Sequence, residues 1–442
     1  MIINGNEIKQ DFFLNKFFDF CIVGSGFAAD SFVKSLDKKF KILLIESGSF
    51  TNNKLSKKLN NYELGSNYFK DAMSRIRLFG GNAALWGGKK RKAKIGKFSK
   101  NDFFKKKNWP ISYNQLNIFE NKALKYFGIN KNEFGNKTQI KKFTDSFDET
   151  PYYYLYPAKR INTYKEKKYY SKRSNITLIY NLNLVDEVSD KKKVHSLLFK
   201  NLLNTLIKIE SKNFILSCGG IENSRILLNF AKKNKSFTNK NIGKNFSEHL
   251  CVYPLVSIPK KKFIFKNNLT ISPKKNIIKK YNIPNFTLQV LDKSKKFYKV
   301  FLQLEQNMSK KNLIKLSKNR DIFNLPIAKI YWKLSKNDFT NIRKIQKILI
   351  NNFKISRDNI FNIEKYKLMF KNKRYKRYIT TPHHHMCTTK MGSSDKNSVI
   401  NKNMRFFGKN NLYILGSSTF SSPSAVNPTF TIVQLSIRLG EY

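Results

Sequence analysis

Residues 18–48 constrain the fold most strongly, because they read as two strands joined by a glycine turn and a helix. The apolar run Phe18–Val23 leads into the turn, Phe27–Leu36 suits a helix, and Lys41–Ile45 is a second apolar run. Strands that are joined through a helix lie parallel in one sheet. The segment therefore predicts an α/β fold built on a parallel sheet.

The turn between the first strand and the helix has the pattern GxGxxA. Gly24 permits a tight turn at Ser25, Gly26 lets phosphate groups approach the backbone, and Ala29 allows close packing of helix on strand. The helix N-terminus favours phosphate charge. Glu46 follows 22 residues after Gly24, where an acid can bind a ribose. The pattern predicts a dinucleotide site, and the competing interpretation is a plain βαβ unit.

Residues 75–92 hold two glycine pairs around a tryptophan, in the sequence RIRLFGGNAALWGGKKRK. Glycine at this density is unsuited to a helix or strand and suits a backbone wrapped closely around a flat ligand. A tight loop with a packed tryptophan is the alternative. The residues expected to contact a ligand here are Gly80, Gly81, Asn82, Trp86, Gly87 and Gly88.

Another glycine turn follows the buried-strand pattern Phe214–Ser217. Gly219 and Gly220 come next, and Glu222–Leu228 suits the start of a helix. We expect this strand to approach the same ligand, with Gly219 in contact. The first domain is then discontinuous, because a long segment separates its two strand–turn–helix units.

Residues 251–380 alternate short β-rich runs with Lys/Asn-rich turns, which predicts a largely antiparallel sheet. Thr340–Phe353 carries apolar residues at helical spacing and is expected to lie across that sheet. The β-rich runs are CVYPLVSI, NFTLQVL, YKVFLQLEQ and AKIYWKLS.

Three of the five histidines are consecutive, at 383–385 in the sequence HHHMCTTKMG. Three adjacent imidazoles are poorly placed to chelate one ion, and no nearby acidic or cysteine pattern supports zinc. We therefore expect no metal here. A catalytic imidazole is the sharper hypothesis, because histidine exchanges a proton near neutral pH.

The segment 411–439 again reads as a strand, a loop and a helix. The apolar run Leu412–Leu415 is followed by a loop of small residues and then by an amphipathic pattern. Pro428 suits the first helical position and Asn427 the N-cap, which would aim the helix dipole at whatever lies before it. A plain helix cap is the alternative. The residues expected at the ligand are Gly416, Ser417, Asn427, Pro428 and Thr429.

The chain has 442 residues, of which 40% are hydrophobic and 14% aromatic, so it can bury a large core and is neither disordered nor fibrous. No run reaches the roughly 18 apolar residues of a membrane-spanning helix. The start MIINGNEIKQDFF lacks the features of a secretory signal, and the four cysteines lack metal-ligand spacing. These features predict a cytoplasmic protein.

The formal charge is +56, from 85 basic and 29 acidic residues. Only 13 of the basic residues are arginine, and the lysines are spread over the whole chain. A nucleic-acid-binding surface would favour arginine at base-reading positions. We therefore attribute the excess to A/T-rich codon usage rather than to a specific nucleic-acid partner. A weak association with anionic membrane surfaces is the other partner that the charge suggests.

Taken in order, these motifs resemble the glucose–methanol–choline (GMC) family of flavin oxidoreductases, from about residue 18 to residue 440. No single motif decides this, but seven in the family's order make coincidence implausible. The subgroup that the chain most resembles acts on sugars and polyols and has members in bacterial polysaccharide gene clusters. The motifs are GSGFAA with Glu46, GGNAALWGG, NWPISYNQLNIFENKALKYFGI, SCGGIENSRILL, GKNFSEH, HHMCTTKMG and SAVNPTFTI.

The resemblance implies an α/β fold, α+β overall, with a Rossmann-like FAD-binding domain and a second domain on a largely antiparallel sheet covered by helices. The FAD-binding domain would be discontinuous, formed by residues 1–95, 165–250 and 381–442. Residues 96–164 and 251–380 would form the substrate-binding domain.

Two positions depart from the family pattern. Cys387 replaces a usual glycine, although some alcohol-oxidising relatives also have cysteine there. Leu85 stands where certain sugar-oxidising members carry a histidine bonded to the flavin. A leucine cannot form that bond, so the resemblance implies non-covalent FAD.

The resemblance also makes His384 and Asn427 a catalytic pair. His384 would take the proton of an alcohol hydroxyl, and Asn427 would donate a hydrogen bond to the developing alkoxide. His383 and His385 are the nearest alternatives for the base, and they are expected to share the face opposite His384. The substrate would be a sugar, a polyol or a related alcohol, with an electron acceptor of unknown identity. The alternative is an inactive FAD-binding structural or carrier protein in a polysaccharide-biosynthesis assembly, and retention of the pair favours the enzyme.

Overall fold

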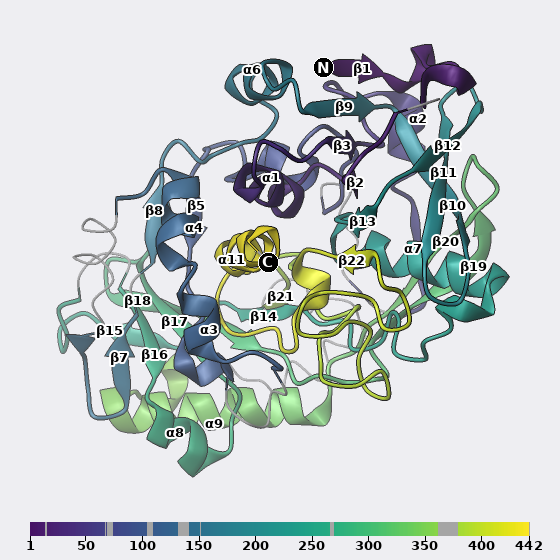
Figure 1. The fold of residues 1–442 in the computed structure, drawn as a ribbon. Helices are drawn as coiled ribbons and strands as arrows, with labels where there is room; N and C mark the ends of the chain where they lie inside the picture. Colours follow the sequence, from purple (N-terminus) through teal and green to yellow (C-terminus); the bar gives the residue numbers. More distant parts are fainter. Residues whose placement is uncertain are drawn as a thin grey trace.

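The computed structural model describes residues 1–13, 16–66, 68, 74–103, 109–130, 141–150, 152–265, 269–360 and 379–441 (Figure 1). Parts of the predicted substrate-binding domain, including Asn108 at the start of one motif, lie outside these residues. Within them, no helix is long and apolar enough to cross a membrane.

The predicted parallel sheet is confirmed, with six strands in the order β1-β9-β3-β2-β13-β22. Every neighbouring pair is parallel. The central strands are short apolar runs with almost no exposed surface, as a sheet covered on both faces requires. The strands are β1 (Ile2–Asn4), β9 (Ile176–Tyr180), β3 (Ile42–Ile45), β2 (Phe20–Val23), β13 (Asn213–Leu216) and β22 (Leu412–Ile414).

Two helices begin where central strands of this sheet end. Helix α1 (Phe27–Ser35) follows β2, and α7 (Gly219–Lys233) follows β13, so their N-termini meet at the carboxyl edge of the sheet. The C-terminal helix α11 (Thr429–Gly440) packs beside α1 near the centre of the molecule (Figure 1). Further α-helices among the described residues are α2 (Lys54–Lys58), α3 (Tyr113–Asn117), α4 (Glu120–Phe127) and α6 (Tyr164–Ser171), of which α3 and α4 contact α11.

An antiparallel meander lies between β9 and β13 in the chain. Its strands are β10 (Leu182–Ser189), β11 (Val194–Asn201) and β12 (Leu206–Glu210). Because β10 follows β9 directly, its first residues lie close to the carboxyl edge of the parallel sheet.

The second large sheet has eight strands, with the order β21-β14-β18-β17-β16-β7-β6 and β15 beside β18. The pairings between its described strands are all antiparallel. Its strands are β6 (Lys141–Lys142), β7 (Phe147–Glu149), β14 (His249–Val252), β15 (Ser257–Pro259), β16 (Thr270–Pro273), β17 (Phe286–Asp292), β18 (Phe297–Glu305) and β21 (Ile379–Thr380).

Three of the four predicted runs contribute to this sheet, but AKIYWKLS does not. It forms most of β20 (Pro326–Tyr331), which pairs with β19 (Leu313–Arg320) and with β4 (Tyr62–Leu64) in a separate sheet. The alternation of residues predicts a strand, whereas its sheet is decided by the neighbouring strand β19 and by β4, which lies far away in the chain. A further small sheet pairs β5 (Ala93–Ile95) with β8 (Tyr153–Leu155).

The helix predicted over residues 340–353 is confirmed as α9 (Lys336–Phe353), which runs under the antiparallel sheet beside α8 (Lys275–Tyr281) (Figure 1). It begins earlier than predicted because Ser335 and Asp338 form a capping box. Its buried residues Ile342, Ile345 and Leu349 share one core with the strands of the sheet.

The prediction that Asn427 caps the C-terminal helix is wrong by one residue. The helix starts at Thr429 with Pro428 as N-cap, and the Pro428 carbonyl accepts the N–H of Ile432 at 2.9 Å. The Asn427 amide instead donates to the carbonyl oxygen of Lys94 on β5, at 3.1 Å. The hydrogen bond to Lys94 on β5 holds the Asn427 side chain away from the start of the helix.

Candidate flavin site

A cavity of about 550 Å³ lies where the glycine turns after β2 and β13 meet the histidine segment. This volume is in the range of small-molecule sites in proteins. Segments from both ends of the chain form its wall. The predicted site residues that line it are Gly24, Ser25, Gly26, Glu46, Gly81, Asn82, Trp86, Gly87, Gly219, His384, Gly416, Ser417, Pro428 and Thr429.

Four predicted site residues lie outside the lining. Ala29 is fully buried in α1. Gly80 supports the first turn, because its N–H donates to Ser25 Oγ at 2.8 Å. The carbonyl of Gly88 accepts from Arg160 at 2.5 Å. The fourth is Asn427, whose amide is held by Lys94.

The first turn is shaped to bring its backbone against a ligand. Gly24 has φ +96°, and a Cβ there would lie 2.6 Å from the carbonyl oxygen of Ser217. Only glycine fits this position. A Cβ at Gly26 would meet nothing closer than 3.8 Å, on the cavity side of the turn. Gly26 therefore leaves open the space that a phosphate at the α1 N-terminus needs.

Glu46 is buried at the end of β3 and accepts hydrogen bonds from the backbone and side chain around it. Its carboxylate accepts from Ser25 Oγ at 2.5 Å and from the Gly48 N–H at 2.8 Å. Burial raises the pKa of Glu46, and the hydrogen bonds from Ser25 and Gly48 oppose that shift. Its place in the cavity wall suits recognition of ribose hydroxyls.

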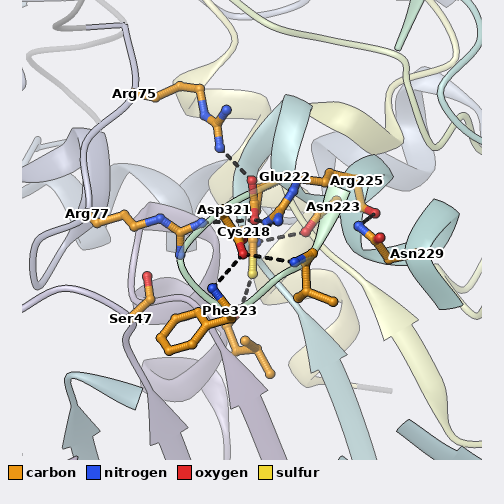
Figure 2. A network of polar contacts seen from close by, with 12 residues as sticks. Ser47, Arg75, Arg77, Cys218, Glu222, Asn223, Arg225, Asn229, Asp321 and Phe323 are labelled. Carbon is orange, nitrogen blue, oxygen red and sulfur yellow. Dashed lines mark hydrogen bonds and ion pairs between the residues drawn. The ribbon is translucent and has the colours of Figure 1, made fainter. Parts of the chain in front are cut away.

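Three arginines gather on Glu222 at the start of α7 (Figure 2). Its carboxylate lies 2.5 Å from Arg75, 2.9 Å from Arg77 and 2.7 Å from Arg225. Asp321 forms a second ion pair with Arg225 and anchors it from the other side. Three positive and two negative groups leave one net positive charge.

That positive charge faces the cavity, because Arg75, Arg77 and Glu222 all line it. Within the described part of the chain, Arg75 Nη1 and Arg77 Nε are buried and have no hydrogen-bond partner. A buried donor without an acceptor is costly. Together with the open space at Gly26, these donors fit an anionic dinucleotide such as FAD.

Replacement of Glu222 by glutamine is expected to destabilise the protein by about 3 kcal/mol, because it leaves two buried arginines without their counter-charge. Burial opposes ionisation of Glu222, but Arg225, Arg77 and Arg75 outweigh it and hold its pKa far below the usual range. Its contribution is therefore full above about pH 4.3, the usual glutamate pKa, and fades as the pH falls towards the lowered folded-state pKa. Urea unfolding at several pH values measures this, with the exposed Glu210→Gln as the matched control. A midpoint equal to that of the control would contradict the assignment.

His384 lies on the cavity wall with its ring against His249, the first residue of β14. The two Nδ1 atoms are 2.9 Å apart, and the rings are nearly perpendicular. The His384 N–H donates to Glu248 at 2.8 Å. Burial lowers the pKa of His384 well below its usual value, and the neighbouring imidazoles His249, His385 and His383 lower it further. The ring is therefore neutral at neutral pH.

His383 and His385 turn towards Glu248 and Tyr68. Their ring centres are 6.1 Å apart, and His385 Nε2 lies 3.6 Å from Glu248. The segment is not fully extended, because His383 has φ +57°. Both rings nevertheless line the cavity, so the face opposite His384 is not remote from the ligand.

Glu248, His383 and His385 have ligand atoms within 4.8 Å of one another, among the residues described. No acidic residue lies near these histidines in sequence, but Glu248 approaches them in space. Its two oxygens already accept hydrogen bonds from the Tyr68 hydroxyl and the His384 N–H. Burial also raises the pKa of Glu248 to about 8, so the carboxyl keeps its proton at neutral pH. This arrangement suits a shared proton better than a metal ion.

Cys387 is fully buried with φ +69°. This backbone region favours glycine, which explains why glycine is usual at the position in the resembling family. The N–H of Cys387 donates to the carbonyl of Ser417 at 3.1 Å, which ties the histidine segment to the loop after β22.

Several residues of the site were not singled out from the sequence. The charged ones and His249 lie inside quoted segments, but their partners lie elsewhere in the chain. The arginines were a usable signal, because guanidinium groups are scarce in this lysine-rich chain. In the cavity wall they are Arg75, Arg77 and Glu222, with Leu182 and Leu184 from β10, and behind the wall they are Glu248 and His249.

Comparison with known proteins gives one family match and several structures of the same fold. Residues 309–436 match the family model described as GMC oxidoreductase. No curated protein sequence matches the chain closely enough to be called a relative. Pyridoxine 4-oxidase from Mesorbium loti has a similar structure, with a TM-score of 0.64 and 13% identity over 96% of this chain and 98% of that one. A formate oxidase variant from Aspergillus oryzae RIB40, studied for FAD modification, has a TM-score of 0.59 and 12% identity over 97% and 98%.

The solved structures share the fold along nearly the whole chain, and the sequence match covers the segment that carries β19, α9, the histidines and most of α11. The wall of the cavity contains both the N-terminal glycine turn and residues of the matched C-terminal segment. Residues 309–436 therefore resemble the GMC oxidoreductase family, and the chain as a whole has the fold of the two oxidase structures.

Proposed function

We propose that the protein oxidises a CH–OH group of a sugar, a polyol or a related alcohol, using non-covalently bound FAD. The observation that carries the proposal is the neutral imidazole of His384 in the wall of the dinucleotide cavity. FAD, when bound, supplies the hydride acceptor. The residues that would hold it are the Gly24–Ala28 turn, Glu46, the arginines on Glu222 and the loop after Gly416.

His384 is the proposed base for the alcohol hydroxyl. A carbon releases hydride readily only as its hydroxyl proton departs, so the site needs an acceptor for that proton. The lowered pKa keeps His384 unprotonated at neutral pH. Its Nδ1 faces His249, which leaves Nε2 as the nitrogen that can take the proton.

Asn427 is the proposed hydrogen-bond donor to the developing alkoxide. Its Oδ1 accepts from Gln303 at 3.4 Å, and its amide nitrogen donates one hydrogen to Lys94. An amide nitrogen carries two hydrogens, so the second remains for the substrate oxygen. Gln303 also donates to the carbonyl of Ala425 at 2.9 Å and so fixes the loop that carries Asn427.

Anaerobic reduction of the bound flavin by a panel of sugars, polyols and simple alcohols tests the proposal. Loss of the oxidised flavin absorbance with one class of alcohol would support it and name that class. A protein that binds FAD but is reduced by no member of the panel, while dithionite reduces it normally, would favour the structural or carrier role.

The purified protein is expected to be yellow and to release intact FAD on acid or heat denaturation. The cavity wall near Trp86 presents Leu85, whose side chain forms no bond to flavin. After precipitation, the absorbance and fluorescence of the supernatant measure the released cofactor. Flavin that stays with the polypeptide pellet would contradict non-covalent binding.

A further inference from the structure

His249 lies behind the proposed base and outside the cavity wall. It is fully buried at the start of β14, and its two ring nitrogens have different partners. Nε2 lies 3.1 Å from the carbonyl oxygen of Pro423, and Nδ1 lies 2.9 Å from His384 Nδ1. The ring therefore bridges the loop that leads to Asn427 and the histidine segment.

These contacts determine where the protons are. A carbonyl oxygen only accepts hydrogen bonds, so the hydrogen of His249 is on Nε2. Burial lowers the pKa of His249 to about 4, although the carbonyls of Pro423 and Ser424 oppose the shift, so the ring carries a single hydrogen at neutral pH. Its Nδ1 is then an acceptor. The Nδ1 atom of His384, facing it at 2.9 Å, must be the donor.

We propose that His249 is a positioning residue that holds His384 in the tautomer with hydrogen on Nδ1. This inference rests on the proposed function, because it assigns Nε2 of His384 as the atom that takes the substrate proton. Glu248, the neighbour of His249, also holds His384, because its carboxyl group accepts the backbone N–H of His384. The dipeptide Glu248–His249 therefore sets both the place and the protonation pattern of the base.

A purely structural role for His249 would not require this pattern. An apolar side chain would fill the same buried volume, but it would leave the Nδ1–H of His384 without an acceptor. An unpaired buried donor is unfavourable enough to shift the tautomer balance by roughly 5- to 150-fold towards hydrogen on Nε2. That tautomer has no lone pair at the atom proposed to act as base.

The test is nitrogen-15 NMR of the FAD-bound protein labelled at histidine, which distinguishes protonated from unprotonated ring nitrogens without any substrate. The chain has five histidines, and a His384→Gln sample identifies the signals of His384. We expect hydrogen on Nδ1 of His384 in the parent. The exposed His195→Asn variant is the control and should leave that pattern unchanged.

His249→Asn and His249→Leu form a matched pair, because the two side chains have nearly the same shape and only asparagine offers an acceptor. We expect His249→Asn to keep hydrogen on Nδ1 and His249→Leu to move it to Nε2. With a reducing alcohol in hand, His249→Leu should slow flavin reduction by roughly 5- to 150-fold, and His249→Asn should restore most of the rate.

Hydrogen on Nε2 of His384 in the parent would overturn the inference, and so would an unchanged pattern in His249→Leu. If His249→Leu fails to fold, the parent and His249→Asn spectra still decide the question. Failure of the proposed function is a separate result, because the tautomer pattern would be as expected while no alcohol reduced the flavin.

Discussion

Replacement of His384 by alanine is expected to slow reduction of the bound flavin by roughly 10² to 10⁴, the usual effect of losing a general base. FAD should stay bound, because the glycine turn and the arginines on Glu222 do not depend on this ring. Stopped-flow measurement of flavin absorbance under anaerobic conditions gives the rate, and the absorbance of the purified protein gives the FAD content.

His383→Ala is the matched control for this prediction. His383 lies in the same segment and the same cavity wall, but its ring is turned towards Tyr68 and His385 rather than His249. We expect a mild effect. A full rate in His384→Ala together with a large loss in His383→Ala or His385→Ala would show that another imidazole is the base. Full rates in all three variants would show that the catalytic site lies elsewhere.

Gly26→Val is expected to abolish FAD binding without unfolding the chain. Gly26 has φ −69°, which valine tolerates, and the nearest atom to an added Cβ is 3.8 Å away. The new side chain would occupy the cavity where phosphates approach the α1 N-terminus. Loss of about two hydrogen bonds to a charged group, each about 1.5–3 kcal/mol, corresponds to roughly 10² to 10⁴ in Kd.

The measurements are the FAD content after purification, titration of the apoprotein with FAD, and thermal unfolding. Gly128→Ala is the control, because Gly128 caps α4 in open space with φ +72° and should cost about 1 kcal/mol of stability with no change in FAD affinity. Gly26→Val that binds FAD as the parent does would refute the placement of the phosphates. A Gly26→Val protein with a collapsed melting temperature would show that the turn itself, and not the cavity, requires glycine.

The parallel sheet and its glycine turn were predictable because their determinants are local. Residues 18–48 contain both strands, the turn and the helix, and each residue acts on its near neighbours. The same holds for α9, where helical spacing and the Ser335 capping box lie in one segment. Only the exact start of that helix was missed.

The partners of the site residues were not predictable, because they come from distant segments. Asn427 has the right residue type for an N-cap, yet Lys94 on another strand takes its amide. Glu248 reaches the histidines only because β14 and β21 pair in the antiparallel sheet just before them. The spacing of residues along the sequence does not predict contacts between such distant segments.

The positions of the scarce residue types, arginine and histidine, also indicate the site, apart from any motif. Only 13 of the 85 basic residues are arginine. An arginine in such a chain therefore indicates a position that needs the planar guanidinium group. Arg75, Arg77 and Arg225 all meet Glu222. Likewise, four of the five histidines meet in the space around Glu248.

The cavity wall draws on residues from near both ends of the chain, from Val23 to Ile432. The pocket is therefore complete only when α11 has packed against α1, so capture of the cofactor requires both segments to be folded. Central strands β2 and β13 must also find each other across almost two hundred residues, which slows folding. Yellow colour in a purified sample is thus a check that segments about four hundred residues apart have come together in the native fold.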